Sequence, residues 1–253
     1  MDLPLTPRQR SQLANKMETE LRAAGSSERA VKEKAYLKSA LDFAGASLPA
    51  IRDCARQVRR EHPALSGSDA LALADELWSS RLHERRMLAV VLLELFVARL
   101  APADLEQLER FVRDSYTWAL VDGLAGDVAA SINAAYPRDA TVDAVVRRWA
   151  GDDDFWVRRS ALLAHLKTLG RRGSFEGWDR FCGFADAMLD ERQFFIRKAI
   201  GWVLREASKT YPDLVAEWLR PRVERISGVT IREAARYLSA ADRDSLLAAY
   251  RAR

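Results

Sequence analysis

Trp118 and Asp122 lie four residues apart in the segment SYTWALVDGLA, and their side chains could do chemistry together. Residues spaced by four share one face of an α-helix. An indole face beside a carboxylate can stabilise positive charge. Two other stretches also place tryptophan among charged residues, DDFWVRRSALLAHL (153–166) and QFFIRKAIGWVLREASK (193–209). Because each helix already has a separate apolar face, the second face indicates a ligand, and a DNA strand fits it best.

Residues 193–209 separate into two stripes when they are placed on a helix at about 100° per residue. The packing face consists of Ile196, Ala199, Ile200, Val203, Leu204 and Ala207. The second stripe has spacings of three, four, three and four, and it consists of Phe195, Lys198, Trp202, Arg205 and Lys209. It predicts a platform whose cations contact phosphates and whose indole contacts a sugar or base. The alternative is that Trp202 packs against the next repeat while the cations are solvated.

The helix that contains Trp118 has its own core stripe, made of Leu120, Val121, Leu124, Val128 and Ile132. Trp118 and Asp122 then lie at the edge of this stripe. Taken alone, Asp122 is more typical of a plain surface charge or of a partner for an arginine in a neighbouring repeat than of a catalytic residue. On the helix that contains Trp156, Arg158 and Arg159 cannot both face the same way. The helical period leaves open which of the two faces the ligand.

Apolar residues recur at spacings of three and four along almost the whole chain, which indicates an all-α protein. The dipeptides Val157-Arg158, Ile196-Arg197 and Ile231-Arg232 recur 39 and 35 residues apart, each followed by alanine two or three residues later. This period is typical of HEAT-like helix pairs, which bury their apolar faces against neighbouring pairs. Because no linker interrupts the pattern, the sequence predicts one domain over residues 1–253. We expect an α-solenoid of about six HEAT-like repeats with a concave DNA-binding face.

The net charge of +4 is too small to indicate nucleic acid by itself, but its distribution is informative. Arginine pairs recur at 59–60, 85–86, 147–148, 158–159 and 171–172. Along one side of a solenoid these pairs would form a track for phosphates, whereas each pair alone is typical of a solvated helix face.

Other features narrow the class of protein. No apolar run approaches the roughly 18 residues of a membrane span, and the N-terminal residues lack an apolar signal region. Cys54 and Cys182 stand far apart without metal-ligand spacing, which indicates reduced thiols in a cytoplasmic protein. His165 lies in an apolar helix and is predicted to be a core residue. The sequence therefore predicts no metal site, no cofactor and no membrane association.

Five segments of the chain, in order, resemble the AlkD-like alkylpurine DNA glycosylases, a family built from HEAT-like repeats. They are AYLKSALDFAGASLPAIR (35–52), TWALVD (117–122), FWVRRSA (155–161), FFIRKAIGWVLREASK (194–209) and ISGVTIREAARYL (226–238). The Gly-Trp-x-Leu-Arg-Glu pattern in the fourth segment is the most specific of these. The resemblance covers most of the chain, and it implies an enzyme that removes cationic N3- or N7-alkylated purines from duplex DNA.

The resemblance also implies roles for individual residues. The positions that carry catalysis and lesion contact correspond to Trp118, Asp122, Arg159 and Trp202, which selects Arg159 over Arg158. Tyr36 matches a tyrosine near the lesion. The other expected DNA contacts are Lys38, Arg158, Lys198, Arg205 and Lys209. Where the family has Trp-Asp-x-Val-Asp, this chain has WALVD, so Ala119 replaces the first acid while Asp122 keeps the catalytic one.

By the same resemblance, the enzyme would hold its substrate without enclosing the base in a pocket. The expected partner is double-stranded DNA containing alkylated bases, bound by a monomer in the cytoplasm that associates with the nucleoid through DNA. Two alternatives remain at this point. One is a relative that binds distorted or branched DNA without excising bases, and the other is a HEAT-type scaffold for protein interactions.

Overall fold

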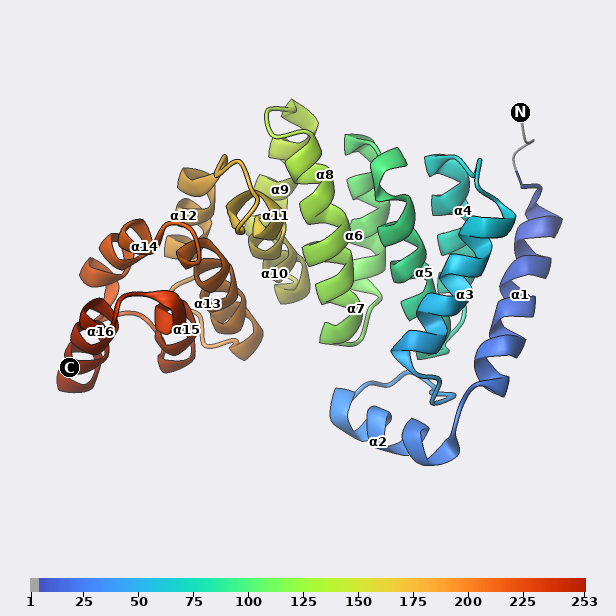
Figure 1. Ribbon diagram of the computed structural model, residues 1–253, viewed down its shortest axis with the longest axis horizontal. Coiled ribbons are helices and arrows are strands. Elements are labelled where there is room, and N and C mark those ends of the chain that lie inside the picture. The colour runs from blue at the N-terminus through green and yellow to red at the C-terminus, as the bar shows by residue number, and fades with distance from the viewer. Residues whose placement is uncertain (1–4) are drawn as a thin grey trace. The chain divides into compact units, whose positions relative to one another are not determined.

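The structure, a computed structural model, describes residues 5–253, and its regular elements are helices (Figure 1). Within this range there is no β-strand, and one isolated bridge joins Asp42 to Leu82. The all-α fold predicted from the sequence is confirmed. None of the described helices combines the length and the apolar composition that a membrane crossing needs. The chain divides into two compact units, Met1–Val128 and Ala129–Arg253, and the expectation of one domain stays a prediction.

The described part of the first unit contains α1 (Pro7–Ala23), α2 (Ser27–Leu37), α3 (Leu48–Glu61), α4 (Gly67–Trp78), α5 (His83–Phe96), α6 (Leu105–Arg113) and α7 (Trp118–Asp122). Many of these helices begin at a hydroxyl side chain that accepts a hydrogen bond from an early backbone N–H. Such caps are Thr6, Ser26, Ser47, Ser66 and Thr117. They satisfy amide groups that the first turn of a helix leaves unpaired. Helix α5 packs on α3 and α4, and α1 packs on the same two helices.

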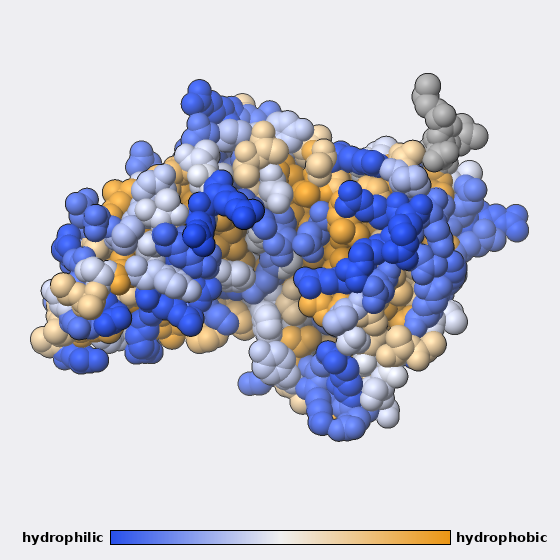
Figure 2. Space-filling view, viewed as in Figure 1, coloured by the Kyte–Doolittle hydropathy of each residue, from blue (hydrophilic) through white to orange (hydrophobic). Residues whose placement is uncertain are grey.

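Helix α2 has no buried residue and lies at one end of α1 and α3 (Figure 1). Figure 2 shows hydrophilic side chains over α2 and hydrophobic residues on the surface next to it. The loop after α2 is fixed by the fully buried Glu84, whose carboxylate accepts hydrogen bonds from the backbone N–H of Ala44 (3.1 Å) and Gly45 (2.5 Å). Gly45 has a φ of 79°, and a Cβ there would lie 2.1 Å from the carbonyl oxygen of Ser26. Glycine therefore lets this loop contact the start of α2 and position the helix.

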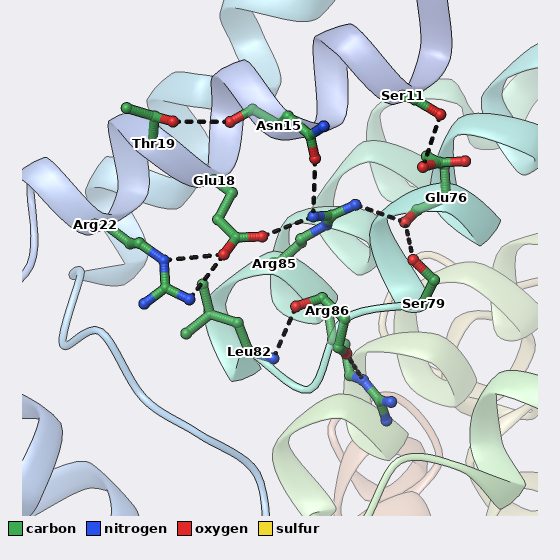
Figure 3. Close-up of polar contacts among 11 residues, drawn as sticks. Ser11, Asn15, Glu18, Thr19, Arg22, Glu76, Ser79, Leu82, Arg85 and Arg86 are labelled. Atoms are coloured by element: carbon green, nitrogen blue, oxygen red, sulfur yellow. Dashed lines mark hydrogen bonds and ion pairs between the residues drawn. The ribbon is translucent and has the colours of Figure 1, made fainter. Parts of the chain in front are cut away.

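A buried arginine joins α1, α4 and α5 (Figure 3). Arg85 of α5 donates hydrogen bonds to the carboxylate of Glu18 in α1 (2.6 Å) and to the backbone carbonyl of Glu76 in α4 (2.9 Å). Arg22 also donates to the Glu18 carboxylate, at 2.7 Å. Burial alone would raise the pKa of Glu18, but the hydrogen bonds from Arg85 and Arg22 outweigh burial and lower it. Arg85 is thus a structural residue within the first unit.

The second unit contains α8 (Ala130–Ala135), α9 (Ala140–Ala150), α10 (Phe155–Leu163), α11 (Leu166–Leu169), α12 (Trp178–Ala187), α13 (Phe194–Ser208), α14 (Pro212–Leu219), α15 (Gly228–Ala234) and α16 (Ala240–Ala252). Helix α10 packs on α13, and α13 packs on α15. These three helices carry the repeated dipeptides, and their first members, Val157, Ile196 and Ile231, are all buried. The repeat predicted from the spacings of 39 and 35 residues is therefore visible as three successive packed helices.

His165 is fully buried in the second unit, as the sequence predicts. Its Nδ1 lies 2.9 Å from the carbonyl oxygen of Ala161, and its Nε2 accepts a hydrogen bond from Nε of Arg180 at 3.1 Å. Arg180 also donates to Asn133 (2.7 Å) and to Asp143 (2.9 Å). Burial and the nearby charge of Arg180 lower the pKa of His165 to about 3. The neutral imidazole therefore belongs to a structural hydrogen-bond network.

Both cysteines are free thiols, in agreement with the expectation of reduced cysteines. Burial raises the pKa of Cys182 to about 12 and also raises that of Cys54. Since the thiolate is the reactive form, neither side chain has the properties of a nucleophile.

Candidate nucleic-acid interface

The helix that carries Trp118 and Asp122 changes its geometry immediately after them. Thr117 caps α7 by accepting a hydrogen bond from the backbone N–H of Ala119 (3.4 Å). Trp118 is the first residue of α7 and Asp122 is the last, and a π-helical segment follows over Gly123–Ala129. Such segments are rare and are often found at functional sites. The pair therefore lies between a helix cap on one side and a π-helical segment on the other.

The core stripe predicted for this helix is present. Each of its five members is at most 2% exposed: Leu120, Val121, Leu124, Val128 and Ile132. Trp118 and Asp122 are both half-buried. The pair therefore lies at the edge of the packed face, as its spacing predicts, and each side chain retains contact with solvent.

Helix α2 brings Tyr36 to Trp118. The two rings meet edge to face, with centroids 5.8 Å apart and planes at 84°, a geometry that aromatic pairs favour. Tyr36 is 72% exposed, so most of its surface is available to a ligand. Lys38, two residues further on, is exposed and ends α2 in the left-handed conformation with a φ of 49°. The first unit thus gathers Tyr36, Trp118 and Asp122 in one region.

Helix α13 has the two faces that its sequence predicts. All six residues of its packing face are buried: Ile196, Ala199, Ile200, Val203, Leu204 and Ala207. In the second stripe, Phe195, Trp202 and Arg205 are half-buried, while Lys198 and Lys209 are exposed. This stripe therefore reaches the surface with its aromatic rings partly covered.

Part of the charge in the second stripe is neutralised within the second unit. Arg205 forms an ion pair with Glu233 of α15. Lys209 forms an ion pair with Glu206 (2.6 Å), and its Nζ lies 5.2 Å from the ring centroid of Tyr237. A phosphate that approached this stripe would compete with the two glutamates for the cations.

Arg159 is buried, whereas Arg158 is half-buried. Arg159 is 1% exposed, donates a hydrogen bond to the backbone carbonyl of Phe195, and holds its guanidinium 5.7 Å from that ring's centroid. Arg158 forms a two-pronged ion pair with Glu191 (3.0 and 2.9 Å) and donates to the carbonyl of Asp152. The hydrogen bonds to Glu191 are the main reason that the pKa of Arg158 is raised. These contacts assign both arginines a structural role, and DNA contact by either of them stays a prediction.

Arginine is used in the same structural way at the start of three helices. In each case the side chain donates a hydrogen bond to the carbonyl of the residue six positions earlier. The pairs are Arg86 with Ser80 (2.7 Å), Arg158 with Asp152 (2.6 Å) and Arg197 with Glu191 (2.7 Å). Sequence reasoning missed this function and interpreted the recurring arginine pairs as a possible phosphate track. The sequence signal that could have revealed it is that each arginine lies six positions after its carbonyl partner in the preceding loop.

An aromatic cluster beside these arginines was also missed. The ring of Trp156 lies 4.8 Å from that of Phe195, and Phe155 lies 4.4 Å from Trp156. Phe194 meets Phe195 edge to face at 5.4 Å and is 51% exposed. The cluster packs the N-terminal ends of α10 and α13 together. It presents one exposed ring to solvent.

The four residues predicted to carry catalysis belong to both units. Trp118 and Asp122 lie in the first unit, while Arg159 and Trp202 lie in the second. Within the units, the structure brings Tyr36 to Trp118 and joins Arg159 to the first turn of the helix that carries Trp202. The catalytic roles of all four residues stay predictions.

Comparison with known proteins shows the family to which this chain belongs. The family model described as "DNA alkylation repair enzyme" matches residues 17–238. The chain belongs to this family. A solved structure described as a predicted DNA alkylation repair enzyme from Enterococcus faecalis is 25% identical, covers 85% of this chain and 97% of its own, and has a TM-score of 0.75. The resemblance to AlkD-like repair enzymes noted from the sequence is therefore confirmed.

More distant structures share the fold. AlkD2 from Streptococcus mutans is 16% identical, covers 91% of this chain and 100% of its own, and has a TM-score of 0.60. Another structure represents "a new family of proteins related to the HEAT-like repeat DNA glycosylases with affinity for branched DNA structures", with 16% identity, 92% coverage of each chain and a TM-score of 0.60. These similarities in fold identify the helix pairs of this chain as HEAT-like repeats. No curated protein is significantly similar in sequence.

Proposed function

We propose that the protein is a DNA glycosylase that hydrolyses the N-glycosidic bond of cationic N3- and N7-alkylated purines in duplex DNA. The observation that carries the proposal is the arrangement on α7, where Trp118 and Asp122 are half-buried and Tyr36 meets the tryptophan edge-on. Membership in the DNA alkylation repair enzyme family and the similarity to the Enterococcus faecalis protein support it.

The leaving group determines how many carboxylates the reaction needs. A purine alkylated at N3 or N7 carries a formal positive charge before the bond breaks. When the bond between C1′ and the purine nitrogen breaks, both of its electrons pass to the purine, which departs as a neutral base. Ordinary glycoside hydrolysis needs a second carboxyl group to protonate the leaving oxygen, whereas this reaction needs none.

The remaining demand is the positive charge that develops on the deoxyribose. The carboxylate of Asp122 stabilises this charge and orients a water molecule toward C1′. The indole faces of Trp118 and Trp202 add cation–π stabilisation. The water oxygen forms the new bond to C1′, and its proton passes to Asp122 or to solvent. The products are a free purine and an abasic site.

Arg159 acts in this proposal mainly by supporting α13. Its hydrogen bond to the carbonyl of Phe195 joins α10 to the first turn of the helix that carries Trp202. A guanidinium that is 1% exposed can contact a phosphate only after the side chain moves outward. The exposed cations Lys38, Lys198 and Lys209 are better placed to bind the DNA backbone.

The test is incubation of the purified protein with duplex DNA containing 7-methylguanine, followed by alkaline cleavage of the abasic sites. Replacing Asp122 with asparagine keeps the shape but removes the anion, so we expect the excision rate to fall by about 100-fold or more. Affinity for the same DNA should stay similar or rise, because a negative charge near phosphate is lost. The matched control is Asp127→Asn, a half-buried aspartate in the adjoining π-helical segment, which should keep the wild-type rate.

Two results would contradict this function. The first is no release of 7-methylguanine or 3-methyladenine by the wild-type protein. The second is efficient release of hypoxanthine, a neutral base whose departure needs a general acid. That result would leave a glycosylase but remove the mechanism based on one carboxylate.

A second candidate is a protein that binds branched DNA without excising bases. The similarity of fold to a protein described as having affinity for branched DNA favours it, as does the internal use of Arg158 and Arg159. This function predicts tighter binding to a four-way junction than to a linear duplex of equal length, with no base release from either. Junction preference in the Asp122→Asn variant as well as in the wild type would agree with it.

A further inference from the structure

A surface pocket of about 520 Å³ lies in the second unit, where α13 ends and α14 begins. The described residues that line it are Arg171, Ser208, Lys209, Pro212 and Tyr237. Two of these lining residues are cations and none of them is an acid. Sites for small ligands measure roughly 300–1,000 Å³, so this pocket is large enough to hold one.

The loop that carries Arg171 is held beside the pocket. The backbone N–H of Phe175 donates to the carbonyl of Thr168 at 2.9 Å, which closes the loop. The ring of Phe175 packs on that of Tyr211, with centroids 3.9 Å apart, and so ties the loop to the start of α14. Arg171 is exposed and has no hydrogen bond or ion pair within residues 5–253. Its guanidinium is therefore available to an anionic ligand.

The second cation of the pocket, Lys209, is already fixed in position. Its Nζ forms an ion pair with Glu206 (2.6 Å) and lies 5.2 Å from the ring centroid of Tyr237. Glu206 has another cationic partner, Arg205, at 3.5 Å. A phosphate that takes over Lys209 therefore leaves Glu206 with a positive partner. Because the lysine is held before the ligand arrives, binding costs less side-chain entropy than it would at a free lysine.

Tyr237 presents an aromatic ring from a fixed backbone. It is the last residue of the short helix η5 (Ala235–Tyr237), which packs on α13. Its neighbours Ala235 and Leu238 are buried, whereas Tyr237 itself is 48% exposed. Aromatic rings placed beside cations bind single-stranded nucleic acid, because every base has a π-face that can stack on them. Bases within a duplex are already stacked on their neighbours, so the ring suits an unpaired nucleotide.

We propose that this pocket binds one unpaired nucleotide, with its phosphate at Arg171 and Lys209 and its base against the ring of Tyr237. Ser208, which is 1% exposed, forms the floor. A nucleotide rather than another phosphorylated ring is assigned because the chain belongs to a DNA alkylation repair family. The same chemistry has two sources, an unpaired nucleotide within a DNA strand and a free mononucleotide.

The first arm of the test measures binding of a fluorescent single-stranded oligothymidylate of about eight nucleotides to the whole protein, by anisotropy at several salt concentrations. Arg171→Ala removes one phosphate contact. We expect the affinity at low salt to fall by about fivefold and the slope of log affinity against log salt to become shallower by about 0.7. Arg172→Ala removes the same charge from the neighbouring exposed residue, which lies outside the lining, and should change neither quantity. Equal losses in the two variants would show a diffuse positive surface and overturn the proposal.

The second arm tests the contact with the base. Tyr237→Leu should lower the affinity for the same oligonucleotide by about tenfold without changing the salt slope, because it removes a stacking surface and no charge. Tyr237→Phe keeps the ring and should bind like the wild type. Tyr136→Leu is the control, since Tyr136 is 39% exposed in the second unit and lies outside the lining. Wild-type affinity in Tyr237→Leu would overturn the proposal. Thermal unfolding followed by circular dichroism confirms that each variant is folded.

The third arm separates the sources by calorimetric titration with thymidine 5′-monophosphate. Binding of the mononucleotide that is lost in Arg171→Ala and in Tyr237→Leu shows that the pocket takes free nucleotides. Binding of the oligonucleotide alone, with the same two losses, shows that the nucleotide belongs to a strand. The proposal is overturned if neither probe binds at low salt. It is also overturned if an oligoglutamate binds with a loss in Arg171→Ala and none in Tyr237→Leu, because the pocket would then be a site for an acidic protein. Since no probe contains an alkylated base, these outcomes are independent of the proposed excision.

Discussion

The buried His165 should make the second unit lose stability in mild acid. Its pKa is about 3 in the folded chain, because of burial and then the charge of Arg180, against an ordinary value of 6.5 in the unfolded chain. The unfolded state therefore takes up a proton below about pH 6.5 that the folded state refuses. The stability that depends on a neutral His165 is fully present above that pH and is lost as the pH falls toward 3. From pH 7 to pH 5, one such histidine lowers the free energy of unfolding by about 2 kcal/mol.

The measurement is urea unfolding at pH 7 and pH 5, followed by far-UV circular dichroism. His165→Gln retains an acceptor for Arg180 and a donor for the carbonyl of Ala161, but it cannot titrate. We expect the loss between the two pH values to be about 2 kcal/mol smaller in this variant than in the wild type. Ile200→Val is the control, because it lowers stability by about 1 kcal/mol while keeping His165. The assignment would be refuted if the free energy of unfolding of His165→Gln fell between pH 7 and pH 5 by as much as that of the wild type. It would also be refuted if the decrease were smaller in the Ile200→Val control than in the wild type.

The remaining predictions concern packing and the ligand face of α13. A Cβ at Gly201 would lie 3.0 Å from the carbonyl oxygen of Thr230. Gly201→Ala should therefore lower the free energy of unfolding by about 1–3 kcal/mol in the same urea assay. Gly183 is a matched helical glycine with nothing within 4 Å of such a Cβ, so Gly183→Ala should instead raise the free energy of unfolding by about 0.5–1 kcal/mol. For excision of 7-methylguanine, Trp202→Phe should cost less than Trp202→Ala, because the phenylalanine keeps an aromatic face near the sugar.

The packing faces could be predicted from the sequence because helical periodicity reports burial directly. The residues predicted to form the core of α13, from Ile196 to Ala207, are all buried. The repeat of 39 and 35 residues likewise identified α10, α13 and α15 as equivalent helices. Apolar spacing could determine these features because burial of one face is the main stabilising effect in a helix that packs against its neighbours.

The arginine contacts and the contact between Tyr36 and Trp118 could not be predicted in this way. A guanidinium at a helix start is suited both to a phosphate and to a backbone carbonyl, and the period alone does not separate the two. Arg158 and Arg159 bind Glu191 and the carbonyl of Phe195, which lie 33 and 36 residues away in sequence. The contact between Tyr36 and Trp118 depends on the loop that Glu84 fixes against the start of α2. Such long-range contacts leave no local signature.

The replacement of an acid by Ala119 bears on the chemistry of α7. A carboxylate at position 119 would place a second negative charge on the turn that carries Asp122 and would project into an apolar cavity that offers it little hydrogen bonding. With alanine there, Asp122 is the single carboxylate of α7, which is sufficient for a leaving group that is already cationic. The charge of the base would then determine whether excision occurs.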